Sequence, residues 1–220
     1  MEEKRYYSSR IIKSYVEYLK KFHPDIAVDP LLKFAGIEMF QLDDEGHWLT
    51  QTEVDRFHDI LERETQDPDI SRKVGRFSVT SRASGALGQY MLGFMNPALS
   101  YGVLEKINGR LSRATVMKTR AIALDQIEAK VTLQPGVEEK PYQCDNRLGG
   151  LEALAKLSTN KFASIEHPVC VHRGGDCCLY LISWKKTASM IWRRIRNYFS
   201  VFGLILCLIA LKIVGAVYWD

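Results

Sequence analysis

The sequence predicts an α+β protein in which a helical N-terminal part packs on an antiparallel sheet, followed by one C-terminal transmembrane helix. Apolar residues recur at helical spacing up to about residue 108, which is typical of amphipathic helices. From Ala114 onward the pattern changes to alternating and β-branched residues, which is typical of strands. The chain then ends in an almost uncharged apolar run, whose length fits a membrane span.

The first half of the chain carries the start signals of successive helices. An apolar stripe predicts a helix over residues 7–22. Asp29 followed by Pro30 predicts the start of a second helix, because Asp caps a helix and Pro fits its first turn. Thr50 and Glu53 form a capping-box pattern. Further helices are expected over residues 50–66, 70–80, 97–108 and 146–157.

The second half predicts four strands, at residues 115–123, 126–133, 162–171 and 177–184. The last two flank residues 172–176, a short segment that contains two glycines. Such a segment between two strands predicts a β-hairpin. The expected division of the chain is therefore an N-terminal helical region over residues 1–83, a ligand-binding region over 84–184, a basic segment over 185–197 and a membrane helix over 198–219.

The membrane prediction depends on Val201 to Trp219, 19 residues with Lys212 as the one charge. About 20 helical residues cross an apolar core roughly 30 Å thick. Arg193, Arg194 and Arg196 precede the run, and basic flanks stay in the cytoplasm. We therefore expect a single-pass protein of the inner membrane with its body in the cytoplasm. The alternative is a buried C-terminal helix of a soluble protein.

Composition excludes several classes of protein. Hydrophobic residues are 46% and charged residues 25%, as in ordinary globular domains. Residues 185–220 hold six basic residues against one acidic, which leaves 24 basic against 25 acidic in residues 1–184. The body therefore has no electrostatic footprint for nucleic acid. The charged N-terminus is no signal peptide, so the cysteines are expected to be reduced.

Four of the five cysteines fall within 35 residues: Cys144, Cys170, Cys177 and Cys178. His167 and His172 lie among them, and thiolates and imidazoles are preferred metal ligands. The predicted hairpin brings Cys170 close to Cys178, whereas Cys177 points to the opposite face of a regular strand. Two alternatives stay open: the cysteines are core residues, or Cys170 and His172 form a nucleophile pair.

Three segments that carry these residues resemble the C-terminal half of the 4-vinyl-reductase-type small-molecule-binding domain, across about residues 84–184. The segments are CDNRLG at 144–149, IEHPVC at 165–170 and GGDCCLY at 174–180. Sensors of that family hold zinc with three cysteines and a glutamate beside a pocket for aromatic effectors. The resemblance implies a structural zinc ion on Cys144, Cys170 and Cys178. His167 stands at the place of the glutamate, so His167 or the neighbouring Glu166 is the expected fourth ligand.

The resemblance also implies a pocket for a small apolar or aromatic molecule. Side chains suited to line it recur at helical spacing before and within the 97–108 helix, and the alternative is that they are core residues. The candidate lining residues are Tyr90, Met91, Phe94, Met95, Tyr101 and Leu104. The N-terminal helices resemble the front of bacterial membrane sensor kinases and cyclases.

We therefore expect a membrane-anchored cytoplasmic sensor, the input part of a bacterial two-component or cyclase-type signalling protein, and a homodimer. The alternative is a membrane-anchored interaction or scaffold protein that binds no ligand. Expected partners are the small ligand and the membrane. The sequence contains no Walker loop, no G-x-S-x-G and no H-E-x-x-H, so these 220 residues carry no familiar catalytic motif. An enzyme that uses Cys170 or Cys178 is the third reading. A kinase or cyclase module would lie in a longer chain.

Overall fold

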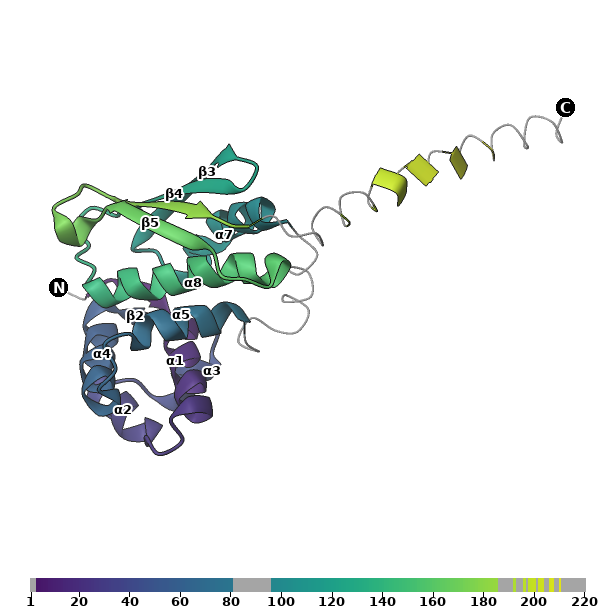
Figure 1. The fold of residues 1–220 in the computed structure, drawn as a ribbon. Coiled ribbons are helices and arrows are strands. Elements are labelled where there is room, and N and C mark those ends of the chain that lie inside the picture. Colours follow the sequence, from purple (N-terminus) through teal and green to yellow (C-terminus); the bar gives the residue numbers. More distant parts are fainter. Residues whose placement is uncertain are drawn as a thin grey trace, which may run out of the picture. The chain divides into compact units, whose positions relative to one another are not determined.

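The structure is a computed structural model that describes residues 3–80, residues 96–185 and single positions between 192 and 210. The chain divides into two compact units, Met1–Lys185 and Lys186–Asp220. The first unit contains the helices and the antiparallel sheet (Figure 1). The predicted α+β class is therefore confirmed for the body.

The elements of the first unit follow the predicted order. Its helices are α1 (Ser9–Phe22), α2 (Val28–Ala35), α3 (Met39–Asp43), α4 (Gln51–Thr65), α5 (Ile70–Thr80), α7 (Pro97–Leu111), α8 (Pro141–Thr159) and the 3-10 turn η2 (Val171–Arg173). Its strands are β1 (Arg5–Ser8), β2 (Trp48–Thr50), β3 (Thr115–Ala123), β4 (Gln126–Leu133), β5 (Ser164–Val169) and β6 (Cys178–Ser183).

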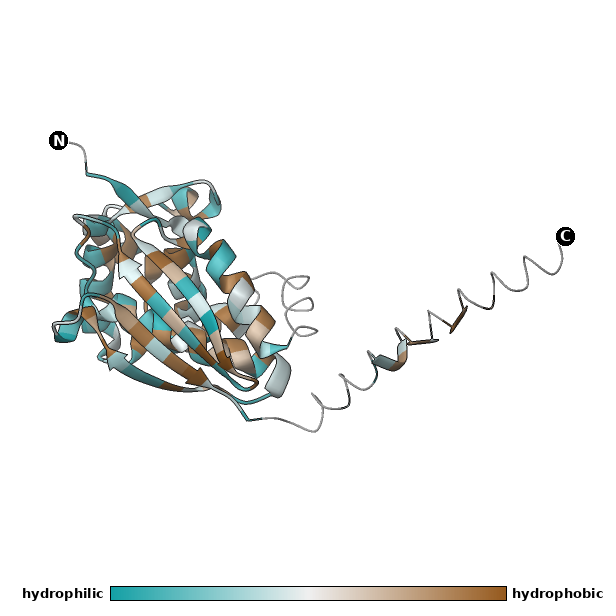
Figure 2. Ribbon diagram, turned by 90° about the horizontal axis from the view of Figure 1, so that it is seen from above, coloured by the Kyte–Doolittle hydropathy of each residue, from teal (hydrophilic) through white to brown (hydrophobic). Residues whose placement is uncertain are grey.

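The main sheet has four antiparallel strands in the order β3-β4-β6-β5. Figure 2 views it from above and shows hydrophobic and hydrophilic residues alternating along the strands. On β4 and β6 the buried residues recur at every second position, as at Ala129 and its register partner Tyr180. The four predicted strands are confirmed, because period-two burial is what a sheet covered on one face requires.

Helix α8 lies beneath the sheet, with α5 along its other side (Figure 1). It begins at Pro141, five residues before the predicted start. Pro141 occupies the first turn, where its missing N–H costs nothing, and the Gln143 side chain accepts a hydrogen bond from the Lys140 N–H at 2.6 Å. Cys144 therefore lies on a helix, and the expectation that it belongs to a loop is wrong.

The crossing of α5 and α8 depends on two glycines. A Cβ on Gly75 would lie 2.0 Å from the Asn146 carbonyl oxygen, and one on Gly149 would lie 2.0 Å from the Arg72 carbonyl oxygen. Only a residue without a Cβ permits such backbone contact. Glu152 of α8, 5% exposed, accepts a hydrogen bond from Arg72 and one of 2.6 Å from Arg76 Nε. Backbone contact and ion pairing together fix α8 against the N-terminal helices.

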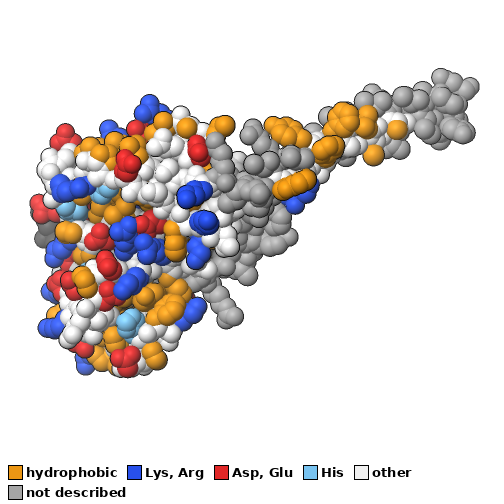
Figure 3. Space-filling view, viewed as in Figure 1, with side chains coloured by type: hydrophobic (Ala, Val, Ile, Leu, Met, Phe, Trp, Pro, Cys, Tyr) orange, Lys and Arg blue, Asp and Glu red, His pale blue; other side chains and the backbone are white. Residues whose placement is uncertain are grey.

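The N-terminal helices share one apolar core. The predicted capping box is confirmed: the Thr50 hydroxyl accepts from the Glu53 N–H at 3.2 Å, and the Thr50 N–H donates to the Glu53 carboxylate at 2.7 Å. The short β1-β2 pair was not predicted, since three or four residues carry too little periodicity. On the face of the molecule in Figure 3, Lys and Arg side chains lie among Asp and Glu side chains.

No helix among the described residues is long and apolar enough to cross a membrane. The predicted span at 198–219 lies mostly outside those residues. The transmembrane part of the predicted fold is therefore not supported by the structure, and it stays a prediction from the sequence.

Candidate metal centre

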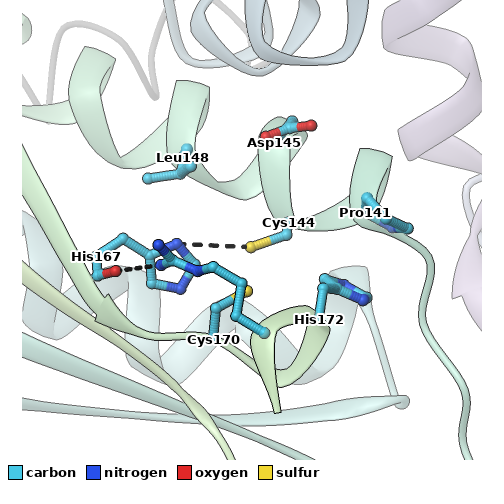
Figure 4. A pocket seen from close by; sticks show the side chains of 8 residues that line it. Pro141, Cys144, Asp145, Leu148, His167, Cys170 and His172 are labelled. Carbon is cyan, nitrogen blue, oxygen red and sulfur yellow. Dashed lines mark hydrogen bonds between the residues drawn. The ribbon is translucent and has the colours of Figure 1, made fainter. Parts of the chain in front are cut away.

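Four side chains with metal-binding atoms meet between α8 and the sheet: Cys144, His167, Cys170 and Cys178. Their donor atoms all lie within 4.8 Å of one another. We call this group the cysteine cluster. Figure 4 shows Cys144 pointing down from α8 toward His167 and Cys170, which approach from the opposite side. A set of three thiols and one imidazole suits a single thiophilic metal ion.

Separate elements position the donors. Cys144 lies in the first turn of α8, His167 on β5, Cys170 directly after β5, and Cys178 at the start of β6. The predicted hairpin between β5 and β6 is tightened by η2, where the Gly175 N–H donates to the Cys170 carbonyl at 2.9 Å. This turn brings Cys170 and Cys178 to the same side, as the sequence predicted.

Within the cluster the atoms are close without being covalently joined. Cys144 Sγ lies 4.0 Å from Cys178 Sγ and 4.0 Å from His167 Nδ1. All of these cysteines are free. The three sulfur residues are buried, with exposed fractions of 4% for Cys144, 6% for Cys170 and 1% for Cys178. His167 is partly exposed as a residue, whereas its Nε2 atom is buried and has no hydrogen-bond partner among the described residues.

A chain of polar contacts links the cluster to a buried ion pair. Tyr180 of β6 lies with its Oη 3.1 Å from Cys144 Sγ, and its ring stacks on His167 at 4.3 Å between centroids. Arg147 donates to the Tyr180 Oη at 3.4 Å and to both Glu139 oxygens at 2.9 and 2.7 Å. Because Tyr180 accepts from Arg147, its own proton is available to Cys144. Such outer contacts orient metal ligands.

The electrostatics of the cluster favour one negative charge on the sulfur pair. The hydrogen bond shared with Cys144 lowers the pKa of Cys178, and the same contact together with burial raises the pKa of Cys144. Burial, opposed by the nearby Arg147 cation, raises the pKa of Tyr180, which therefore stays protonated and able to donate. The cluster thus combines one sulfur whose pKa is lowered with one whose pKa is raised, beside a phenol that can donate a hydrogen bond.

A cavity of about 380 Å³ adjoins the cluster. Its lining residues are Pro141, Cys144, Asp145, Leu148, His167, Cys170, His172 and Arg173. Arg173 is exposed, so the cavity reaches the surface, and its guanidinium donates to the His167 carbonyl. Burial raises the pKa of Asp145. The cavity size is at the lower end of the range for small-molecule sites, roughly 300–1,000 Å³.

The structure distinguishes the candidates for the fourth ligand. His167 joins the three cysteines, whereas Glu166 is exposed and lies outside the group. Cys177 is partly exposed and also lies outside it. His172 lines the adjoining cavity, and its Nε2 is buried without a hydrogen-bond partner in the part of the chain that the structure describes.

The predicted ligand-lining residues are only partly placed. Tyr101 of α7 is fully buried, donates to the Leu151 carbonyl at 2.8 Å and stacks on Trp184 at 5.8 Å between centroids. Leu104, on the same helix, is partly buried. Four of the predicted residues lie outside the described residues: Tyr90, Met91, Phe94 and Met95. The predicted aromatic pocket stays a prediction.

Sequence reasoning did not find Tyr180, Arg147 or Glu139. A buried arginine paired with a glutamate eight residues before it on the chain has no periodic signature. The one available signal was position: Tyr180 follows Cys178 by two residues, so both lie on one face of a strand. Arg147 follows Cys144 by three residues, so both lie on one face of a helix.

No protein-family profile matches the sequence, and no curated relative matches it. Solved structures do match the fold. An H-NOX protein from S. oneidensis in an Fe(II)NO state has a TM-score of 0.62 at 15% identity, covering 81% of this chain and 99% of that one. An oxygen binding H-NOX domain related to soluble guanylate cyclases has a TM-score of 0.59 at 18% identity, covering 82% and 100%. A structure from a study of heme distortion in the H-NOX family has a TM-score of 0.59 at 17% identity, covering 82% and 96%.

These matches correct two expectations. The resemblance to the 4-vinyl-reductase-type domain is wrong as an assignment, because the structural neighbours over four-fifths of the chain are H-NOX domains. It depended on short cysteine-containing segments, which do not determine a fold. The structural zinc ion came from that resemblance and is wrong with it, since the neighbours are described with Fe(II) and heme.

Neither His58 nor His167 fits as an axial ligand of haem iron. Haem iron takes protein ligands such as His, Cys, Met or Tyr only at its axial positions. The sequence has no histidine between His58 and His167. The Nε2 atom of His58 lies 2.6 Å from the Ser71 hydroxyl, and the His58 ring stacks on the Tyr142 ring with centroids 3.8 Å apart. His167 points into a group of four donors within 4.8 Å of one another, an arrangement that surrounds a bare ion and leaves no plane for a porphyrin. The described residues thus combine the fold of H-NOX domains with four clustered donors that suit a bare metal ion.

Proposed function

We propose that residues 1–185 are a small-molecule sensor domain whose responsive centre is one thiophilic metal ion held by Cys144, His167, Cys170 and Cys178. The observation that carries this proposal is the convergence of four donor atoms within 4.8 Å. They come from segments separated along the chain, and apolar packing alone gives no reason for four soft donors to meet. The H-NOX fold supports the sensory role, since one neighbour is described as oxygen binding and related to soluble guanylate cyclases.

The cavity beside the cluster supports the sensing half of the proposal. It is lined by three of the four donors and reaches the surface at Arg173. A small molecule with a donor atom could enter there and displace His167, the one residue of the four that is partly exposed. A change of ligand at His167 would move β5 relative to α8, because that residue connects them through the metal. Movement of an element in response to ligand is what a sensor requires.

Metal analysis of the full chain tests the metal half. We expect about one metal ion per chain in protein purified in detergent under reducing conditions without chelator. Cys144→Ser, Cys170→Ser and Cys178→Ser should each lose the metal and unfold at lower temperature, because binding energy at such a site is folding energy. Cys177→Ser is the matched control and should keep it, since Cys177 adjoins Cys178 but lies outside the cluster. Absence of metal from the wild type would contradict the proposal.

Nitric oxide is a suitable probe of the sensing half, because one neighbour is described in an Fe(II)NO state. The cobalt-substituted chain should show thiolate-to-metal absorption, and nitric oxide should change it. The change should be smaller in a variant that blocks the cavity, such as Leu148→Trp. An absorption band that does not respond to any small donor molecule would reduce the site to a structural one.

The proposal includes a membrane anchor at residues 198–219 and an output module of the kinase or cyclase type. The anchor rests on the sequence, which has an apolar run with a basic flank. The output module rests on the likeness of the fold to a domain described as related to soluble guanylate cyclases. Cell fractionation with protease treatment of spheroplasts tests the anchor. Recovery of the chain in the soluble fraction would contradict it.

A further inference from the structure

Several large apolar side chains of the sheet half are exposed to solvent. Leu124, in the two-residue turn between β3 and β4, is 75% exposed, which is the highest value for a large hydrophobic residue among those the structure describes. Leu99, Ile122 and Phe162 are exposed as well. A single exposed leucine is ordinary, whereas several apolar side chains gathered in one place mark an interaction site. The position of these four residues in the fold therefore decides their meaning.

The strand register brings three of them to the same end of the sheet. One position of each strand lies side by side across that end: Ala123 of β3, Gln126 of β4, Ser183 of β6 and Ser164 of β5. Ile122 and Leu124 flank the first of these positions, and Phe162 stands two residues before the last. The three side chains therefore belong to one end of the body.

Helix α7 reaches the same end. The Tyr101 ring stacks on the Trp184 ring with centroids 5.8 Å apart, and Trp184 directly follows the aligned Ser183. Leu99 stands two residues before Tyr101 on α7, so it also lies toward this end. We call the group of Leu99, Ile122, Leu124 and Phe162 the apolar end.

The chain leaves the body at the apolar end. The Trp184 N–H donates to the Asp125 carbonyl at 3.1 Å, which fixes the last residues of the body beside the β3–β4 turn. The body ends at Lys185, and residues 186–197 separate it from the run predicted to cross the membrane. These residues reach at most roughly 43 Å when fully extended. An anchored body would therefore have its apolar end within reach of the bilayer surface.

Lysines accompany the apolar side chains. Lys161 and Lys185 are exposed, and Lys156 Nζ lies 4.5 Å from the centre of the Phe162 ring. Aromatic rings prefer the interface of a bilayer, and lysines beside them extend toward the headgroups. Anionic headgroups attract such lysines. The apolar end thus combines the two kinds of side chain that bind an anionic membrane surface.

We propose that the apolar end is a docking surface for a lipid bilayer with anionic headgroups. Ile122 and Leu124 enter the bilayer interface, and the lysines contact the headgroups. This contact gives a reason for a leucine in a two-residue turn, where Gly, Asn and Asp are preferred. The inference rests on the proposed anchor, which brings the bilayer to this end of the body. Cys178 stands at the other end of β6, so the cysteine cluster faces away from the membrane.

Tryptophan fluorescence of the full chain in lipid vesicles tests the proposal. Leu124→Trp and Phe40→Trp each add one tryptophan to the native four. Phe40 is the matched control, because it is 71% exposed but belongs to α3 among the N-terminal helices. In vesicles of anionic lipid with brominated acyl chains, which quench tryptophan, the fluorescence added at residue 124 should be lost and that at residue 40 retained. Equal quenching of both, or no quenching at residue 124, would overturn the proposal.

Flotation of the wild type with the vesicles separates this inference from the anchor. A chain that floats but shows no quenching at residue 124 overturns the docking surface and leaves the anchor standing, whereas a chain that stays in the soluble fraction overturns both. Replacing the anionic lipid with zwitterionic lipid should weaken the quenching at residue 124, and so should Lys161→Glu combined with Lys185→Glu. Quenching that responds to neither change would overturn the role of the lysines.

Discussion

Two clusters of buried and partly buried polar side chains contact the first turns of α8, from opposite sides. The histidine cluster, on the side of the N-terminal helices, consists of Tyr15, Asp55, His58, Ser71 and Tyr142. The cysteine cluster lies on the side of the sheet. Tyr142 and Asn146, four residues apart on α8, face the first, and Cys144 faces the second. Helical spacing explains why alternate positions of this short segment serve opposite sides.

The clusters differ in how their polar atoms are satisfied. In the histidine cluster, Tyr15 donates to Ser71 at 3.0 Å, His58 Nε2 lies 2.6 Å from the same hydroxyl, and Tyr142 donates to Asp55 at 2.7 Å. In the cysteine cluster Cys144 Sγ lies 4.0 Å from Cys178 Sγ and 4.0 Å from His167 Nδ1, and the buried His167 Nε2 has no hydrogen-bond partner among the described residues. A closed network indicates a structural role, whereas converging metal-binding donors with an unpaired imidazole nitrogen indicate a site for a further ligand.

The largest expected effect comes from a substitution that displaces α8 and so disrupts both clusters. Gly149→Ala places a Cβ 2.0 Å from the Arg72 carbonyl oxygen, so α5 and α8 must separate. We expect a loss of more than about 4 kcal/mol in the free energy of unfolding, in the range of severe core disruptions. Denaturant unfolding of the full chain measures it.

Gly150→Ala is the control for this prediction. Its Cβ would meet no atom closer than 3.8 Å, and an alanine inside a helix is favoured over glycine by up to about 1 kcal/mol. It should therefore be neutral or stabilising. Equal effects of the two substitutions would show that the close backbone crossing is not what holds α8 in place.

The second-largest expected effect is a loss of stability at low pH that comes from the histidine cluster alone. Burial lowers the pKa of His58 from 6.5 to about 4, although Asp55 and Asp59 oppose this effect. In the unfolded chain His58 therefore becomes protonated below pH 6.5, whereas in the folded chain it becomes protonated only near pH 4. The contribution of neutral His58 to the free energy of unfolding is complete above pH 6.5 and is lost as the pH falls toward 4. At 1.36 kcal/mol per pKa unit the loss is about 3 kcal/mol.

Thermal unfolding of the wild type and of His58→Gln between pH 7 and pH 4 measures this contribution. The melting temperature of the wild type should fall more steeply than that of the variant. Metal content should stay the same in both, because His58 belongs to the other cluster. Parallel melting curves would mean that His58 is not held neutral in the folded protein.

The smallest effect acts on the cysteine cluster without removing a donor. Tyr180→Phe deletes the hydroxyl 3.1 Å from Cys144 Sγ and keeps the ring that stacks on His167. We expect metal affinity to fall by roughly 10- to 100-fold, which is typical when an outer contact of a metal ligand is lost. A competition titration with a chelator measures it.

Tyr101→Phe is the matched control, since it also removes a buried tyrosine hydroxyl, here one bonded to the Leu151 carbonyl. It should lower stability by about 1 kcal/mol and leave metal affinity unchanged. If both substitutions weaken metal binding equally, the Tyr180 hydroxyl has no particular role at the cluster.

Local patterns explain which parts could be predicted from the sequence. The four strands of the main sheet followed from alternation, and the start of α4 from Thr50 and Glu53. Hairpin geometry predicted that Cys170 and Cys178 lie close together, whereas the choice of Cys144 and His167 to complete the set came from the resemblance to the 4-vinyl-reductase-type domain. The start of α8 was missed because Pro141 was not recognised as a first-turn residue. The buried Arg147–Glu139 pair and the Gly75–Gly149 contact arise only from tertiary packing, which no local pattern encodes.

The fold family was missed for a related reason. Short cysteine segments matched another family, whereas the likeness to H-NOX domains lies in the arrangement of helices and strands, at 15–18% sequence identity. At that level few residues are shared, so the order of elements carries the relationship.

X-ray absorption spectroscopy of the metal-loaded full chain tests the central claim most directly. It identifies the atoms bound to the metal. The structure predicts three sulfur neighbours and one nitrogen neighbour, from Cys144, Cys170, Cys178 and His167, with one sulfur fewer or no metal in Cys178→Ser. A shell of nitrogen and oxygen without sulfur, or the scattering pattern of an iron porphyrin, would contradict the account.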